Sequence, residues 1–153
     1  SLYNSKEAMS VVPDDFEVPF GKGRIRREGK DLSVFTYGNT THFCLEAAQE
    51  LAQENYTIEV FDLRSLAPLD EERILNSVKK TNRALIVHED KVFGGFGGEV
   101  LSLIQEKAFE HLDAPVKRVG STFTPVGFNR IFEKATLPNT EKIKQAMLEV
   151  LKY

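Results

Sequence analysis

Residues 84–104 read ALIVHEDKVFGGFGGEVLSLI, and this stretch decides the fold. It opens with an unbroken apolar run at 84–87, which is typical of a strand covered on both faces. A glycine-rich segment follows at 93–98, and apolar residues at helical spacing follow it at 100–104. A strand that passes through a turn into a helix is the repeating unit of α/β folds, so the stretch predicts a parallel sheet with helices packed on it.

The same alternation continues on both sides of this stretch. Three more β-branched or aromatic runs are predicted strands, at residues 32–37, 57–62 and 116–120. Helix-capping residue types precede the other apolar stripes, at Thr40 or Thr41, at Asp70, and at Asn139 or Thr140. Loose alternation over 18–25 indicates an edge strand or hairpin, and a short helix is predicted near 130–134. The sequence therefore predicts an α/β three-layer sandwich with a mostly parallel sheet of about five strands.

Composition excludes several classes of protein. The chain has 153 residues, of which 41% are hydrophobic and 28% are charged, as in one ordinary globular domain. The formal net charge of −3 provides no basic field for a nucleic-acid backbone. No run approaches the ~20 apolar residues of a membrane span. We therefore expect neither a nucleic acid nor a membrane as a partner.

The glycine-rich segment is the first candidate site, because glycine loops that open helices can cradle phosphates. A dinucleotide fingerprint fails here, since its third glycine would fall on Val100. A Walker loop fails as well, since Glu99 follows Gly98 where a lysine is needed. Two interpretations stay open: a regulatory or anion-binding loop at 94–98, and a tight loop whose glycines admit a close neighbour.

His88, Glu89 and Asp90 form the second candidate, since ligands bind at the carboxyl ends of strands in open α/β sheets. They could form an acid–base pair, but a structural or interface histidine is the favoured interpretation. Histidines and cysteines are too few and too badly spaced for a predicted metal site.

Nucleophilic catalysis has no signature in the sequence. Cys44, the only cysteine, lies on the apolar stripe of its predicted helix and is expected in the core. No G-x-S-x-G elbow occurs. Phe93 and Phe96, beside glycines, indicate a contact surface instead. Residue chemistry alone therefore predicts no active site.

A series of short motifs in order carries a family resemblance. They are VPFGKGRIRREGKDL at 18–32, TYG at 36–38, EVFDLRSLAPLD at 59–70, VKKTNR at 78–83, VHE at 87–89, the glycine-rich segment, APV at 114–116 and LPN at 137–139. The sequence resembles the C-terminal domain of the β subunit of a thiamine diphosphate-dependent 2-oxo acid dehydrogenase, with the transketolase C-terminal fold. It is similar to the branched-chain 2-oxoisovalerate and pyruvate types, and the motifs at 87–98 are closer to the branched-chain one.

The resemblance implies a part of an assembly. The whole enzyme decarboxylates a 2-oxo acid on thiamine diphosphate with Mg²⁺ and passes the acyl group to a lipoyl acyltransferase. The family's catalytic and cofactor-binding residues belong to other domains, so none is expected in this chain. Implied partners are an α subunit or fused α half, a second β subunit and the acyltransferase. The implied compartment is the bacterial cytoplasm or the mitochondrial matrix.

The resemblance also divides the chain. Residues 1–31 would be the linker and arm leaving an upstream pyrimidine-binding domain, and 32–153 the transketolase C-terminal-like domain. Under this interpretation the chain starts at Ser1, not Met, because a domain boundary lies there. The basic cluster at 22–30 would then serve interdomain packing.

Two groups of interface residues are expected, one from the residue chemistry above and one from the resemblance. The interface or loop candidates are His88, Glu89, Phe93, Gly94, Gly95, Phe96, Gly97 and Gly98. The candidates for docking a basic partner are Glu106, Glu110, Asp113 and Tyr153. Glu106 and Glu110 are four apart, so we expect them on one helix face, where a merely solvated face is the alternative.

Overall fold

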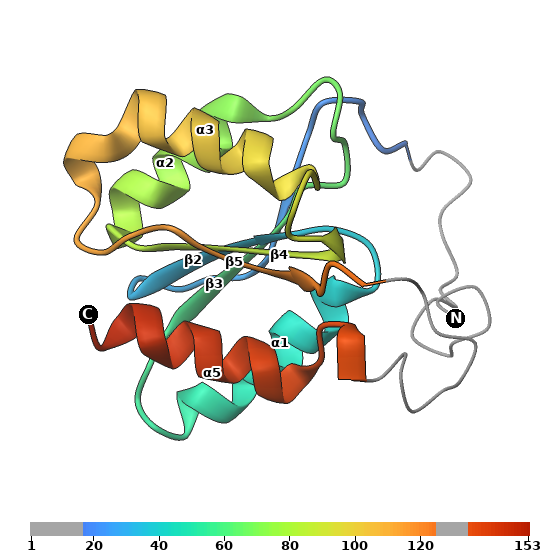
Figure 1. Cartoon of the computed structure of the whole chain (residues 1–153). Coiled ribbons are helices and arrows are strands. Elements are labelled where there is room, and N and C mark those ends of the chain that lie inside the picture. The colour runs from blue at the N-terminus through green and yellow to red at the C-terminus, as the bar shows by residue number, and fades with distance from the viewer. Residues whose placement is uncertain (1–16, 125–134) are drawn as a thin grey trace.

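The computed structural model describes residues 17–124 and 135–153 (Figure 1). They contain a five-stranded sheet in the order β1-β3-β2-β4-β5. The strands are β1 (Arg24–Arg27), β2 (Leu32–Thr36), β3 (Ile58–Asp62), β4 (Ala84–Lys91) and β5 (Lys117–Ser121). Strand β1 is antiparallel to β3, and the other neighbours are parallel. The mostly parallel sheet predicted from the sequence is confirmed.

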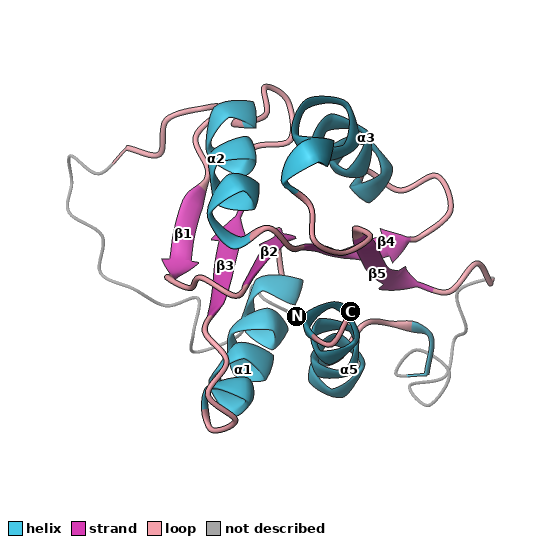
Figure 2. Cartoon of the chain, turned by 90° about the vertical axis from the view of Figure 1, so that its left-hand side faces the viewer, coloured by secondary structure: helices cyan, strands magenta, loops and turns pink. Residues whose placement is uncertain are grey.

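Helices cover both faces of the sheet (Figure 2). On one face lie α2 (Glu71–Thr81) and α3 (Gly97–Ala108), followed by the short 3-10 helix η3 (Phe109–His111). On the other face lie α1 (Thr40–Ala52) and α5 (Thr140–Leu151). The fold is therefore the predicted three-layer sandwich. None of its helices in the described ranges is long and apolar enough to cross a membrane.

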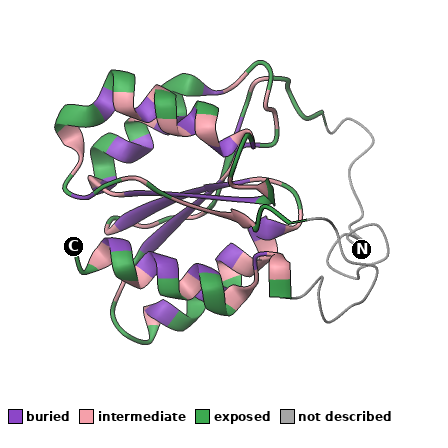
Figure 3. Ribbon diagram, viewed as in Figure 1, coloured by how far each residue is buried: buried purple, intermediate pink, exposed green. Residues whose placement is uncertain are grey.

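Two apolar cores hold the layers together. One core packs α1 and α5 on the sheet and includes Cys44 and Met147. The other packs α2 and α3 on the opposite face and includes Phe35, Phe61 and Ile104. All five residues of β2 are buried, as Figure 3 shows for the middle of the sheet. Each large apolar side chain buried in this way contributes about 1.5–3 kcal/mol, so the central strands form a rigid frame for the loops at their ends.

The helix starts are only partly as predicted. Asn139 does cap α5, since its side chain accepts a hydrogen bond from the Lys142 backbone N at 2.9 Å. The cap predicted at Thr40 or Thr41 is wrong: Asn39 precedes α1, and Thr40 donates its hydroxyl to the Tyr37 carbonyl. Asp70 does occupy the N-cap of α2, but its carboxylate accepts from the backbone N of Gly23 at 3.0 Å. The short helix predicted near 130–134 lies outside the described residues.

Candidate functional site

The glycine loop, defined as residues 92–98, connects β4 to α3 at the carboxyl edge of the sheet. Strand β4 is longer than predicted, because Lys91 pairs with Ser121 of β5 beyond an irregularity in the ladder. The loop then turns at Gly94, whose φ of +74° favours glycine. This extension places the loop beside the carboxyl ends of β4 and β5.

His88 lies buried beneath this loop, and the loop packs on its ring. Its imidazole has no solvent exposure, and three glycines surround it. A Cβ atom added at Gly95, Gly97 or Gly120 would lie 2.8, 2.4 or 3.0 Å from an atom of that ring. Gly95 and Gly97 of the loop and Gly120 of β5 (Lys117–Ser121) therefore provide the space that the histidine occupies.

The environment of His88 favours its neutral form. Burial lowers the pKa of His88, and Arg118 acts in the same direction, while the carboxylate and backbone of Asp90 oppose both. Neither ring nitrogen has a hydrogen-bond partner of good geometry among the described residues. Tyr37 stacks on the imidazole with ring centroids 6.3 Å apart, and burial raises the pKa of its hydroxyl.

This geometry does not provide an acid–base pair. A general base must reach the proton that it removes, and the His88 ring is sealed beneath the loop. Glu89 is exposed, so the two side chains do not converge on one site. No group of side chains in residues 17–124 and 135–153 could hold a metal ion. Anion binding by the loop stays a prediction, although the nearby Arg118 already donates to the Val92 carbonyl at 3.1 Å.

Two exposed aromatic rings make the outer surface of the site. Phe93 is 74% exposed and Phe123 is 69% exposed, with ring centroids 5.1 Å apart. The Lys91 ammonium lies 5.0 Å from the centre of the Phe123 ring. Phe96 is only half-buried and contacts Tyr37 edge-on. Sequence reasoning singled out Phe93 but missed Phe123, which reaches the loop only because β5 pairs with the end of β4.

The docking candidates are spread over the molecule. Glu106 lies on α3, Glu110 lies in η3, and Asp113 follows η3. The prediction that Glu106 and Glu110 share one helix face is wrong, because the backbone leaves the α conformation at Ala108, with φ −143° and ψ 13°. Tyr153 follows α5 in the opposite layer and is 77% exposed. Asp113 is exposed and forms an ion pair with Arg83 at 3.9 Å.

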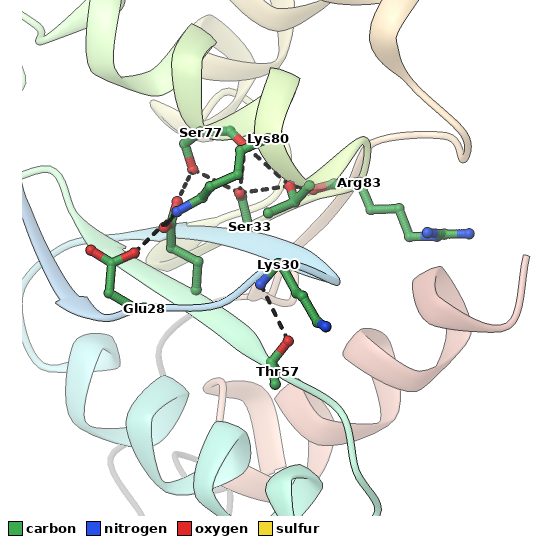
Figure 4. A network of polar contacts seen from close by, with 9 residues as sticks. Glu28, Lys30, Ser33, Thr57, Ser77, Lys80 and Arg83 are labelled. Carbon is green, nitrogen blue, oxygen red and sulfur yellow. Dashed lines mark hydrogen bonds and ion pairs between the residues drawn. The ribbon is translucent and has the colours of Figure 1, made fainter.

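A buried polar network between α2 and the sheet was not predicted (Figure 4). Glu59 of β3 is fully buried, and its carboxylate accepts hydrogen bonds from Ser77 and Lys80 of α2. Lys80 also donates to Glu28 at 3.1 Å, and Ser33 of β2 bonds to the Ser77 carbonyl.

The network stabilises the charges that it contains. Partial burial would lower the pKa of Lys80, but its bonds to Glu59 and Glu28 raise it. The network therefore fixes the position of α2 on β2 and β3. The signal that could have indicated it is Glu59, which stands between the apolar residues Ile58 and Val60.

The sequence matches the family model described as "Transketolase, C-terminal domain" over residues 21–143. It is 40% identical over 150 residues to the acetoin:2,6-dichlorophenolindophenol oxidoreductase subunit beta of Bacillus subtilis (strain 168), with 97% of this chain and 43% of that protein covered. It is 38% identical over 151 residues to the mitochondrial pyruvate dehydrogenase E1 component subunit beta of Dictyostelium discoideum, with 97% and 42% covered. It is 38% identical over 144 residues to the 2-oxoisovalerate dehydrogenase subunit beta of Bacillus subtilis (strain 168), with 94% and 44% covered.

A solved structure is similar as well. A split gene transketolase, described as an inactive beta4 tetramer, matches with a TM-score of 0.81 and 25% identity, over 94% of this chain and 46% of that chain. The chain thus spans less than half the length of the curated relatives and of this solved structure.

Proposed function

The chain belongs to the transketolase C-terminal domain family, and on that premise we propose that it is the C-terminal assembly domain of the β subunit of a thiamine diphosphate-dependent 2-oxo acid dehydrogenase. Beta subunits named for pyruvate and 2-oxoisovalerate, which are both 2-oxo acids, align with nearly the whole chain and support this assignment. The substrate class is a 2-oxo acid, and the branched-chain type is favoured by the motifs at 87–98. These relatives include mitochondrial and bacterial proteins, so the mitochondrial matrix and the bacterial cytoplasm are the proposed compartments.

The proposed parent enzyme divides its work between domains. Its other domains would bind thiamine diphosphate and Mg²⁺, the groups on which a 2-oxo acid is decarboxylated before acyl transfer to a lipoyl acyltransferase. This chain would bind neither group and would be inactive alone. The burial of His88 supports this division, because the one histidine at the carboxyl edge of β4 cannot reach a substrate.

Subunit pairing is the role that the structure supports best. Phe93 and Phe123 expose a contiguous aromatic surface, and a loop packed on buried His88 holds the first of them in place. Exposed aromatic pairs of this kind are common at the centres of protein interfaces. We assign this surface to contact with the α subunit, a fused α half or a second β subunit, and it is the single observation that carries the role.

Docking of the acyltransferase is assigned to a second group of residues, which come from two layers of the fold. Glu110, Asp113 and Tyr153 are exposed, as is Glu106, and carboxylates of this kind steer a basic partner. Residues 1–31 are proposed as the linker and arm from an upstream pyrimidine-binding domain. Within that arm, β1 pairs with β3, and so it would anchor the arm on the sheet.

Calorimetry with thiamine diphosphate and Mg²⁺ tests the proposal. The 153-residue chain is titrated alone, and the complete β subunit is titrated after co-expression with its α subunit. We expect no binding to the chain alone, and binding together with 2-oxo acid decarboxylation in the complete assembly. Micromolar binding by the chain alone, or a complete assembly that decarboxylates no 2-oxo acid, would contradict the proposal.

A further inference from the structure

A shallow groove runs between the segment 66–69 and the outer face of α3. Its cavity volume is about 430 Å³. The apolar part of its lining comes from half-buried Leu66, Leu69, Phe96 and Leu103. We call it the α3 groove, and its floor is apolar and partly exposed.

The rim of the α3 groove is acidic. Glu71, Glu99 and Glu106 line it together with Lys107. Lys107 donates to Glu71 at 2.6 Å, so these two charges neutralise each other. Among the described residues, Glu99 and Glu106 have no ion-pair partner within 4 Å, and both are exposed. The rim therefore carries three carboxylates and one ammonium, which is an excess of negative charge, although Lys107 also attracts Glu106 electrostatically.

The two carboxylates have a defined spacing. Glu99 and Glu106 are seven residues apart on α3, which is two helical turns or roughly 10 Å. Leu103 lies between them on the same side of the helix and lines the same groove. The surface thus presents an apolar contact flanked by two negative charges.

We propose that the α3 groove binds a basic amphipathic helix of a partner protein. Such a helix would place an aliphatic side chain against Leu103 and two cationic side chains, seven residues apart, against Glu99 and Glu106. A symmetric contact with a second copy would instead bring the same carboxylates together, which costs free energy. The chain's net charge of −3 further favours a basic partner over a copy of itself.

The α3 groove shares only Glu106 with the residues proposed for docking, because Glu110, Asp113 and Tyr153 do not line it. The inference holds whether or not the parent enzyme is a 2-oxo acid dehydrogenase. Its test needs no cofactor and no substrate, so its failure is distinguishable from failure of the proposed function.

A designed peptide tests the groove directly. The probe is an alanine-based helix of about 16 residues with two arginines seven apart and two adjacent leucines midway between them. Binding to the 153-residue chain is followed by calorimetry and by backbone amide NMR shifts. We expect shifts at α3 and at 66–69. The double variant Glu99→Lys/Glu106→Lys should bind about tenfold more weakly or worse, which corresponds to about 1.4 kcal/mol.

A peptide of opposite charge and a control substitution far from the groove make the result specific. A peptide with glutamates in place of the arginines should prefer the double variant, and Glu141→Lys on α5 should bind the original peptide normally. The proposal is overturned if the unmodified chain does not bind, if the swap does not reverse the preference, or if Glu141→Lys weakens binding equally. It is also overturned if the complete parent protein does not bind the peptide, because one of its own segments then covers the groove.

Discussion

The Nε2 atom of His88 lies 2.4 Å from the position that a Cβ atom on Gly97 would occupy. Gly97→Ala would therefore force the buried imidazole to move, and we expect it to destabilise the chain by about 1–3 kcal/mol. Gly98→Ala is the matched control, since its Cβ would come within 3.4 Å only of the flexible end of Arg118. Urea unfolding of both variants measures the difference, and equal stabilities would contradict this account.

The pKa of His88 predicts a pH dependence of stability. Burial lowers that pKa from its usual 6.5, so the unfolded chain takes up a proton at a higher pH than the folded chain does. The stability due to neutral His88 is complete above about pH 6.5 and is lost as the pH falls through the lower folded-state pKa.

Replacement of the imidazole should flatten this dependence. His88→Phe keeps an aromatic ring beside Tyr37 but cannot take up a proton, so its unfolding free energy should fall less between pH 7 and pH 5. The unmodified chain, unfolded in parallel, provides the reference slope. Urea unfolding at several pH values measures both slopes, and an unchanged slope in His88→Phe would refute the assignment.

The two carboxylates that bind Lys80 should differ sharply in importance. Glu59 is fully buried, so Glu59→Gln leaves the hydrogen bonds of Lys80 and Ser77 without their charged acceptor and should cost about 1.5–3 kcal/mol. Glu28 is exposed, and Glu28→Gln should cost less than about 1 kcal/mol. Thermal or chemical unfolding of the two variants provides the comparison. Similar losses of unfolding free energy in both variants would show that the buried network is not stabilising.

The exposed aromatic pair should matter for assembly and not for folding. Phe93→Ser/Phe123→Ser should change the stability of the 153-residue chain by no more than about 0.5 kcal/mol per site. The same changes in the complete β subunit should weaken its association, as measured by sedimentation. Phe109→Ser is the control, because Phe109 is 68% exposed but lies in η3, away from this pair. Unchanged association would remove the pairing role from this surface.

The sequence predicted the sheet well because its central strands are continuous apolar runs. Residues 84–87 are all buried in β4, as such a run requires. The prediction that Glu106 and Glu110 share one helix face was wrong. A four-residue spacing places side chains together only while the helix continues, and the backbone leaves the α conformation at Ala108.

Contacts between distant segments could not be predicted. Glu59 meets Ser77 and Lys80 only after α2 has packed on β3. Phe123 approaches Phe93 only through the pairing of β5 with β4. In both cases, the functional or structural meaning of the residue depends on a partner far along the chain.

The antiparallel edge strand β1 has a consequence for solubility. A parallel sheet that ended at β3 would leave a flat, apolar strand with unpaired backbone groups, a template for aggregation. Strand β1 covers that edge, and its sequence RIRR carries three arginines, of which Arg26 pairs with Asp62 across the ladder. Like charges on a second copy would repel these arginines. This edge of the sheet is thereby protected against strand-to-strand aggregation, also when the domain is separated from a larger assembly.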